Sequence, residues 1–512
     1  MRTTTFHLKT LTVAIATLSI ASLSNAAGLD RSGQDVTAFF QDGLYAEAVY
    51  TYIDADVSGK DSANRVPTDN TYVDGDDTGD IAESYDFFRY GVKADINDTF
   101  SFGILYDEPF GAAAEYTGDN NFVAQGDINN SITQLTDGAF NAATLGPAIG
   151  NLTAAAEAAG AEAQRLGQLA ATATDPQAAQ DFAQQAQAQA EAAQDFAADA
   201  TRLGTAGAIA QAEASTAGEN TNVEVRSNSV TALLGMKLGP NKNFQVYGGP
   251  VAQRIESEVK LRGLAYGPAT GYTSRNSPDT DYGWIAGLAY SKPEIALKAA
   301  LTYRSEIDHN MNIAETYPLV GILAASQLPD GAPPEALAAA AAAASQSTNM
   351  EITTPESVNF DFQTGINPTT LATARVRWVP WGDFKITPPL YNEVSQRSYG
   401  PDGLNLVDYD DDQWQVELGL AKRLAPALAV SGTVGWDSGA GDPTTSLGPI
   451  EGYYSAGLGA KYDVTENWAV SAGGKYLWFG DAQGRLPSGK IVADFEDNDG
   501  YIFGVKLSYQ DK

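Results

Sequence analysis

Cysteine is absent from this chain of 512 residues, and histidine occurs only at His7 and His309. Without cysteine the protein can have no disulfide framework, no thiol catalysis and no thiolate metal site. Only His309 lies beyond the N-terminal leader, so a zinc site has no second imidazole and Ser-His-Asp chemistry is not expected. We therefore expect a protein that is not an enzyme and that needs no cofactor or metal.

Positive charge is also scarce. The 31 Lys and Arg residues stand against 64 Asp and Glu residues, which gives a formal net charge of −33. Phosphate binding needs an excess of cations, so nucleic acid is not an expected partner. The acidic runs at residues 74–77 and 408–412 carry oxygens that suit a hard cation such as calcium. They lack the spacing of a calcium loop, and we interpret them as solvated loops, with cation binding left open.

The body of the chain contains no apolar run long enough for a membrane-spanning helix. The one apolar run near the start, residues 11–23, follows basic residues and precedes small residues at 24–26. This pattern predicts a secretory signal peptide over residues 1–26. Because a spanning helix needs about 20 apolar residues, an exported membrane protein of this composition must cross the membrane as a β-barrel.

Alternating patterns are what the sequence has in abundance. Residues 282–308 read YGWIAGLAYSKPEIALKAALTYRSEID, two alternating runs joined by a short turn at SKPE. In the second run every other residue is apolar or aromatic, from Ile295 through Leu301 to Tyr303, whereas Lys298 and Arg304 fall on the opposite face. This period of two predicts antiparallel strands rather than a helix.

The same pattern recurs along the chain and predicts fourteen strands, near residues 44–57, 85–95, 100–116, 223–238, 243–262, 281–290, 295–308, 350–364, 370–385, 411–423, 427–437, 450–463, 468–480 and 497–509. Short turns alternate with long loops between them. An even strand number with loops sorted by length is typical of an outer-membrane barrel whose termini are periplasmic. We predict an all-β fold, a 14-stranded antiparallel transmembrane barrel over residues 43–512, preceded by a short segment at 27–42.

The loop between the third and fourth strands, residues 120–220, is rich in Ala, Gln and Glu. Helical runs near 152–171 and 177–203 flank Asp175 and Pro176, which suit an N-cap and a first helical residue. We predict an extracellular helical hairpin, either a mobile solvated insert or a lid or contact to other molecules. A second short helix is expected at residues 336–344.

The third strand contains the sequence YDEPFG at residues 106–111. Proline has no N–H to donate to a strand ladder. Two interpretations follow: either the strand ends at Asp107 and a loop begins, or the strand is kinked and leaves a local gap in the barrel wall.

Four stretches resemble the FadL family, the outer-membrane transporters for long-chain fatty acids, a group that also contains aromatic-hydrocarbon transporters. They are AVYTYIDADVSG from Ala48, INDTFSFGILYDEPFGAAAEY from Ile96, ALTYRSEI from Ala300, and the closing strands at residues 414–509. The resemblance implies a fourteen-stranded barrel with an inward kink in the third strand that opens a lateral gap.

By the same resemblance, Pro109, Phe110 and Gly111 are the residues of the lateral gate. The family usually begins with a longer segment that plugs the lumen and contains an Asn-Pro-Ala motif. This chain has no such motif before its first strand. What plugs the lumen is therefore left open by the sequence.

These features lead to a hypothesis of function: an uptake channel in the bacterial outer membrane for long-chain fatty acids or other hydrophobic compounds, with lateral release at the third strand. Arg304, Lys298 and Arg262 are candidates to bind a carboxylate head group, and each could instead pair with acidic residues of the lumen. The alternatives are a general porin for small polar solutes, and a surface adhesion or receptor barrel that acts through the helical insert.

The expected partners follow from the same hypothesis. They are the hydrophobic cargo, outer-membrane lipid, and the barrel-assembly machinery, since the last strand resembles its recognition signal through Gly504, Leu507 and Tyr509. The barrel is expected to act as a monomer.

Overall fold

The computed structural model describes residues 29–329 and 331–511. The predicted signal peptide, residues 1–26, lies outside the described residues. Within the described ranges, no helix has both the length and the apolar character needed to cross a membrane.

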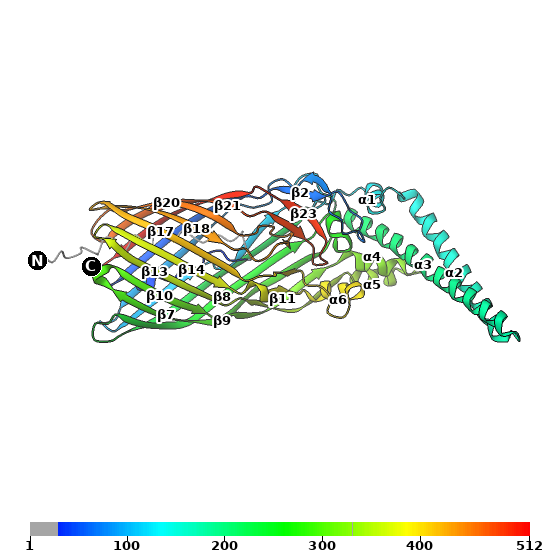
Figure 1. Cartoon of the computed structure of the whole chain (residues 1–512), viewed down its shortest axis with the longest axis horizontal. Coiled ribbons are helices and arrows are strands. Elements are labelled where there is room, and N and C mark those ends of the chain that lie inside the picture. Colours follow the sequence, from blue (N-terminus) through cyan, green and yellow to red (C-terminus); the bar gives the residue numbers. More distant parts are fainter. Residues whose placement is uncertain (1–28, 330, 512) are drawn as a thin grey trace, which may run out of the picture.

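A closed antiparallel β-barrel forms the body of the protein (Figure 1). Strand β1 (Tyr45–Asp56) pairs on one side with β4 (Tyr85–Asp95) and on the other with β24 (Asp499–Gln510), which closes the wall. The remaining undivided strands are β7 (Asn222–Leu238), β8 (Phe244–Lys260), β9 (Thr273–Lys292), β14 (Thr370–Val379), β17 (Gln413–Ala425), β18 (Leu428–Asp437), β20 (Tyr453–Asp463) and β21 (Trp468–Phe479).

Three wall strands are each divided into two segments. They are β5 (Phe100–Asp107) with β6 (Gly111–Glu115), β10 (Leu297–Arg304) with β11 (Ile307–Thr316), and β12 (Ser345–Thr354) with β13 (Ser357–Asn367). Counting each pair once gives fourteen strands, so the predicted fold class is confirmed. The strand predicted at 281–290 extends in fact from Thr273 to Lys292.

The two faces of the wall differ as a membrane barrel requires. On β24, Tyr501 and Phe503 are 48% and 47% exposed, whereas the intervening Ile502 is 2% exposed and Lys506, on the same inner face, 3%. A soluble protein would not turn its aromatic residues outward in this way. The aromatic face instead suits lipid, and the polar face points to the barrel interior.

Helices gather at the extracellular end (Figure 1). They are α1 (Ile128–Leu135), α2 (Ala142–Thr172), α3 (Pro176–Ser215), α4 (Pro318–Ser326), α5 (Pro334–Ala342) and α6 (Pro389–Tyr399). A five-stranded sheet lies in the same loops: β2 (Gly59–Ser62), β3 (Asp74–Asp77), β19 (Thr444–Thr445), β22 (Ala482–Arg485) and β23 (Ile491–Phe495). A two-residue pair, β15 (Lys385–Ile386) and β16 (Val407–Asp408), completes the strands of the described chain.

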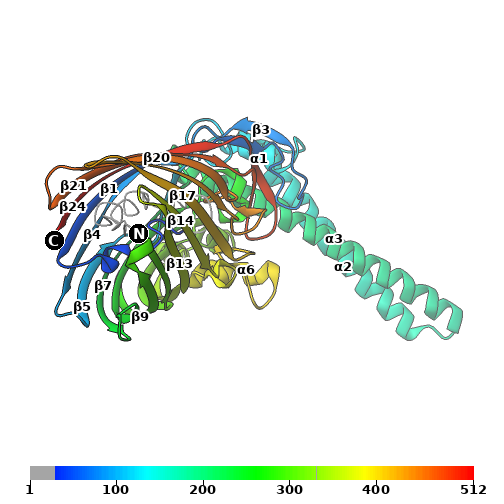
Figure 2. The same ribbon diagram turned by 60° about the vertical axis from the view of Figure 1, so that its left-hand side comes forward.

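Helices α2 and α3 form the predicted antiparallel hairpin, which projects far from the barrel (Figure 2). Asp175 caps α3 by accepting from the N–H of Gln177, and Pro176 is the first helical residue, as predicted. The helix continues to Ser215, twelve residues beyond the predicted end at residue 203. Its last turns are buried at the barrel mouth, where Ile209 is 0% exposed. Tertiary burial therefore extends a helix whose Ala-rich sequence has little amphipathic signal.

The short N-terminal segment, residues 29–41, lies buried inside the barrel. Its Asp30 receives two hydrogen bonds from the guanidinium of Arg377 on β14, at 2.6 Å and 3.0 Å. Its Asp35 lies 3.1 Å from a guanidinium nitrogen of Arg89 on β4 and 3.3 Å from one of Arg375 on β14. These partners lie on different parts of the wall, so the segment spans and fills the lumen. This segment is the plug that the sequence left undetermined.

Because the ion pair of Asp30 with Arg377 holds the plug in the lumen, we predict that the wild-type channel is closed and that breaking this pair opens it. Replacing Arg377 with Met leaves a carboxylate that is 0% exposed without its cation, and such a loss costs about 3–5 kcal/mol. We expect the plug to leave the lumen and a planar bilayer to show ion conductance that the wild type lacks. Arg226→Met removes an equally charged but exposed side chain and should leave the current unchanged. A closed R377M channel would contradict this role.

Candidate functional site

An apolar cavity of about 60 Å³ lies in the upper lumen beside the plug. One of its walls follows a single row across four neighbouring strands, Ala112 on β6, Val225 on β7, Ser257 on β8 and Asn276 on β9. With strands about 4.8 Å apart, this row spans roughly 14 Å. The rest of the lining is mostly aliphatic: Leu29, Val57, Ile81, Ala114, Val223, Val259, Ile386, Leu406, Val407, Leu447, Pro449 and Ile450. None of the lining residues carries a formal charge.

The wall is interrupted directly beside this cavity. β5 and β6 both pair with β7, in the registers Asp107 with Ser229 and Gly111 with Arg226. Three residues, 108–110, therefore stand opposite two on β7, which is the count of a β-bulge. On the other side, the ladder between β4 and β5 ends at Tyr90 and resumes only as the isolated bridge between residues 82 and 114. The strand neither ends at Asp107 nor continues straight, and the kinked interpretation describes it.

The plug closes this interruption from inside the barrel. The N–H of Arg31 donates to the carbonyl of Pro109 at 2.7 Å, and the N–H of Gly111 donates to the carbonyl of Leu29 at 2.8 Å. The guanidinium of Arg31 lies 3.9 Å from the centre of the Tyr85 ring on β4. A Cβ at Gly111 would lie 2.3 Å from Cζ of Arg31, so a side chain at this position would displace the guanidinium. Arg31 thus occupies the space between β4 and β6.

The three predicted gate residues meet at this point. Pro109 and Gly111 bond the plug backbone, and Phe110 is 2% exposed with its ring 5.8 Å from that of Trp381. Phe110 also exchanges two hydrogen bonds with the hydroxyl of Ser227. The structure therefore brings all three residues together between the plug and the wall.

The three candidate cations lie apart from one another and none lines the apolar cavity. Arg304 is 4% exposed and donates to the hydroxyls of Ser229 and Thr231 at 3.2 Å and 3.3 Å. Arg262 pairs with Glu219 at 2.7 Å and also donates to backbone carbonyls beneath the helices.

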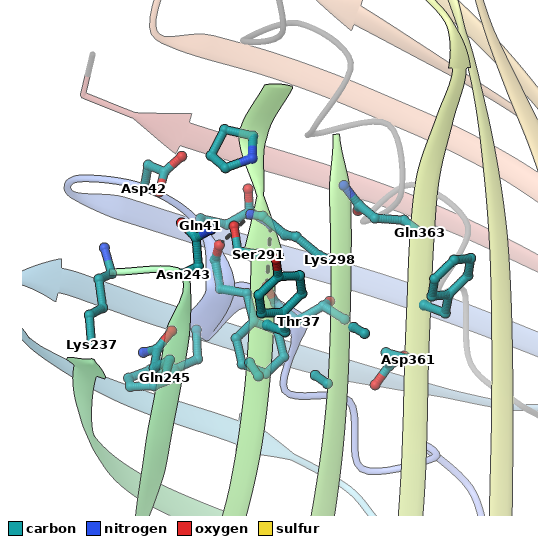
Figure 3. Close-up of a pocket in the computed structure, with 18 of the residues that line it drawn as sticks. Thr37, Gln41, Asp42, Lys237, Asn243, Gln245, Ser291, Lys298, Asp361 and Gln363 are labelled. Carbon is teal, nitrogen blue, oxygen red and sulfur yellow. Dashed lines mark hydrogen bonds between the residues drawn. The ribbon is translucent and has the colours of Figure 1, made fainter. Parts of the chain in front are cut away.

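Lys298 belongs to a second cavity, of about 530 Å³, at the periplasmic end of the plug (Figure 3). Its ammonium donates to the carbonyl of Phe40 at 2.6 Å. The lining mixes both signs of charge, with Lys93, Lys237, Lys242, Lys298 and Arg375 against Asp42, Asp95, Asp98, Asp361 and Glu417. The plug therefore separates an uncharged upper cavity from a charged lower one.

Sequence reasoning missed Asp30, Arg31 and Asp35, the charged residues of the plug. Their only signal is the cluster DRSGQD at residues 30–35, shortly after the predicted signal peptide. Such a cluster reads as a solvated tail, because the cations that hold it are more than fifty residues away in the sequence. Strand β14 carries Arg375 and Arg377 but no acidic residue. These two cations could have indicated that an acidic partner lies elsewhere in the chain.

Glu451 follows Ile450, a lining residue of the apolar cavity, in the loop between β19 and β20. It accepts a hydrogen bond from the N–H of Gly441 at 3.2 Å. Burial raises the pKa of Glu451 from its ordinary value of 4.5 to about 7, and the nearby Asp442 and Asp411 add to the rise. The folded protein thus binds this proton more tightly than the unfolded chain.

We predict that the loop with Glu451, which also carries the cavity-lining residues 447–450, becomes less stable as pH rises. Because the folded pKa is raised, stability falls between about pH 4.5 and about pH 7 as the carboxyl ionises. We expect hydrogen-exchange protection factors in residues 438–452 to be lower at about pH 8 than at about pH 5. Glu451→Gln stays neutral and should remove this difference. An equal pH response in wild type and E451Q would refute the assignment.

A closed antiparallel barrel with an apolar outer band, aromatic residues turned outward and a plugged lumen defines an outer-membrane transport barrel. Residues 264–510 match the family model described as outer membrane protein transport protein (OMPP1/FadL/TodX). The resemblance to the FadL family is thereby confirmed over this part of the chain, and the protein is an outer-membrane β-barrel.

One solved structure supports the fold, and two further ones are less similar. A Pseudomonas aeruginosa FadL homologue is 13% identical, with 99% of this chain and 97% of that chain covered and a TM-score of 0.57. The Pseudomonas putida toluene transporter TodX is 11% identical, with 93% and 92% covered and a TM-score of 0.47. The Ralstonia pickettii toluene transporter TbuX is 9% identical, with 97% of each chain covered and a TM-score of 0.48. A comparison with curated protein sequences gives no match.

Proposed function

We propose that this protein is an uptake channel for hydrophobic compounds, long-chain fatty acids among them, and that it releases its cargo sideways at the interruption of β5 and β6. One observation carries the proposal: the apolar cavity has no charged lining residue and lies beside this interruption, with Ala112 of β6 in its lining. A cavity without charge binds apolar groups by removing them from water.

Sideways release suits the contents of the lumen. Below the cavity the plug is held by buried ion pairs, and the periplasmic cavity is lined by charges of both signs. An apolar molecule moving straight down would have to enter this polar space and then the aqueous periplasm. Passage between β4 and β6 leads from an apolar cavity to the lipid-facing surface, where the cargo stays out of water.

Opening requires the plug to move. Arg31 fills the space between Tyr85 and Gly111, and its backbone bonds to Pro109. Withdrawal of the segment around Arg31 would uncover the interruption, with Pro109, Phe110 and Gly111 as its edge. Ligand in the cavity contacts Leu29, two residues from Arg31, so cargo binding and gate opening act on the same short segment.

For fatty acids, the carboxylate needs a cation, and we retain Arg304, Lys298 and Arg262 as candidates. Lys298 is the one that lines an open cavity, whereas the guanidinium groups of Arg304 and Arg262 are buried among hydrogen-bond partners.

We predict that a disulfide across the interruption blocks transport. Ala82 and Ala114 form an isolated antiparallel bridge at the upper edge of the interruption, a spacing that suits a disulfide. Because the chain has no cysteine, an A82C/A114C pair is the only thiol pair present. We expect oxidation to reduce uptake of labelled oleate at least about tenfold, which requires a barrier increase of about 1.4 kcal/mol, and reduction to restore it.

The matched control places the pair at Ala469 and Ser508, which face each other in the continuous ladder of β21 and β24. This lock should leave uptake unchanged in both redox states. Full uptake through the oxidised A82C/A114C protein would exclude release at this edge.

The projecting hairpin tests the adhesion alternative. Only the base of α3 is buried at the mouth, from Leu203 onward, so residues 152–198 can be replaced by a short linker without exposing it. We expect oleate uptake within about twofold of the wild type, since the removed turns lie outside the cavity and the plug. A loss as large as that of the oxidised lock would assign the hairpin a part in transport.

A further inference from the structure

One polar pair stands in the wall of the apolar cavity. Asn276 on β9 is 6% exposed and donates from its amide nitrogen to the hydroxyl oxygen of Ser257 on β8, at 2.7 Å. The amide oxygen of Asn276 is buried and has no hydrogen-bond partner among the described residues. Both side chains line the cavity. An unsatisfied buried acceptor is costly, so this atom needs an explanation.

Two of the other hydroxyls of the cavity, those of Thr445 and Ser274, are already engaged. The hydroxyl of Thr445 accepts from the N–H of Leu447 at 3.3 Å. The hydroxyl of Ser274 interacts with that of Tyr272. Ser257 and Asn276 sit where the β8–β9 ladder shifts register, between Ile255 and Ser257. Among the described residues, neither side chain bonds any further strand, so their remaining hydrogen-bonding capacity is free at the cavity wall.

The pair keeps free donors and a free acceptor. Asn276 uses one of its two amide N–H groups toward Ser257, which leaves the Asn276 oxygen to accept, and the Ser257 O–H and the second amide N–H to donate. If the amide is turned over, Ser257 donates to the oxygen, and the amide N–H and a Ser257 lone pair remain. A group that completes either arrangement must both donate and accept a hydrogen bond. A hydroxyl does so, whereas a hydrocarbon does neither and a carboxylate only accepts.

We propose that this pair recognises the hydroxyl of a neutral amphiphile, an alcohol or a phenol with an apolar body. The apolar body would lie along the row from Asn276 through Val225 to Ala112, toward the interruption. An anionic head group is disfavoured, because no cation lines the cavity to offset its desolvation. In this closed state the cavity of about 60 Å³ admits only part of a ring or chain, since a cavity that holds benzene measures about 150 Å³, so a whole ring enters as the plug moves.

This inference deepens the proposed function, and its test separates the two. The full-length barrel in detergent is titrated calorimetrically with p-cresol, toluene and p-toluate, which differ only in bearing a hydroxyl, a hydrogen or a carboxylate. We expect p-cresol to bind about tenfold more tightly than toluene, the effect of one satisfied hydrogen bond, and p-toluate to bind most weakly.

Variants locate the effect. Asn276→Leu replaces the amide with an apolar group of similar volume and should weaken p-cresol about tenfold while leaving toluene unchanged, which also shows that the cavity is intact. Ser257→Ala should weaken p-cresol in the same direction. Ser274→Ala removes a hydroxyl of the same cavity that is already engaged and should preserve the preference for p-cresol.

Each outcome decides a different point. Three results overturn hydroxyl recognition while the proposed transport function stands. They are equal affinity of the wild type for p-cresol and toluene, tighter binding of p-toluate than of p-cresol, and a preference for p-cresol that persists in both N276L and S257A. Failure of all three compounds to bind the wild type counts against the apolar cavity as the cargo site, and with it against the proposed function.

Discussion

Lipid offers no hydrogen bonds, so every backbone N–H and C=O of a membrane wall must find its partner within the protein. The barrel meets this demand by closing β1 on β24. At the interruption between β5 and β6 the neighbouring strand β4 no longer supplies partners. The plug replaces them, because Arg31 donates to the carbonyl of Pro109 and the carbonyl of Leu29 accepts from Gly111. The defect in the wall and the segment that covers it are therefore one structural unit.

The ion pairs of the plug explain how so short a segment holds its place. A peptide of about a dozen residues has too little apolar surface to bind by burial alone. Asp30 and Asp35 are instead held by guanidinium groups from β4 and β14, where desolvation makes removal of either partner costly. The same charges fill the lower lumen and leave only the upper lumen apolar. Polarity thus divides the interior into a part that can accept hydrophobic cargo and a part that excludes it.

Much of the wall could be predicted from residue patterns. Alternation gave the fourteen strands, and the proline at Pro109 indicated the interruption, because both are local properties of strand chemistry. The breaks at residues 305–306 and 355–356 escaped notice. The two breaks lie opposite each other, since Arg304 pairs with Ser357 and Ile307 with Thr354. A break that depends on how two strands pair does not change the residue pattern of either strand alone.

The sequence by itself determined the class of fold, the strand number and the place of the kink, since side-chain period and proline geometry act within a few residues. Only the tertiary structure decided what fills the lumen and which side chains face the cargo. The ion pair of Asp30 with Arg377 joins residues 347 positions apart, and Ser257 meets Asn276 only because β8 and β9 shift register there. Contacts across the lumen depend on the positions of all the strands that separate the two residues in the barrel. A local sequence pattern does not contain this information.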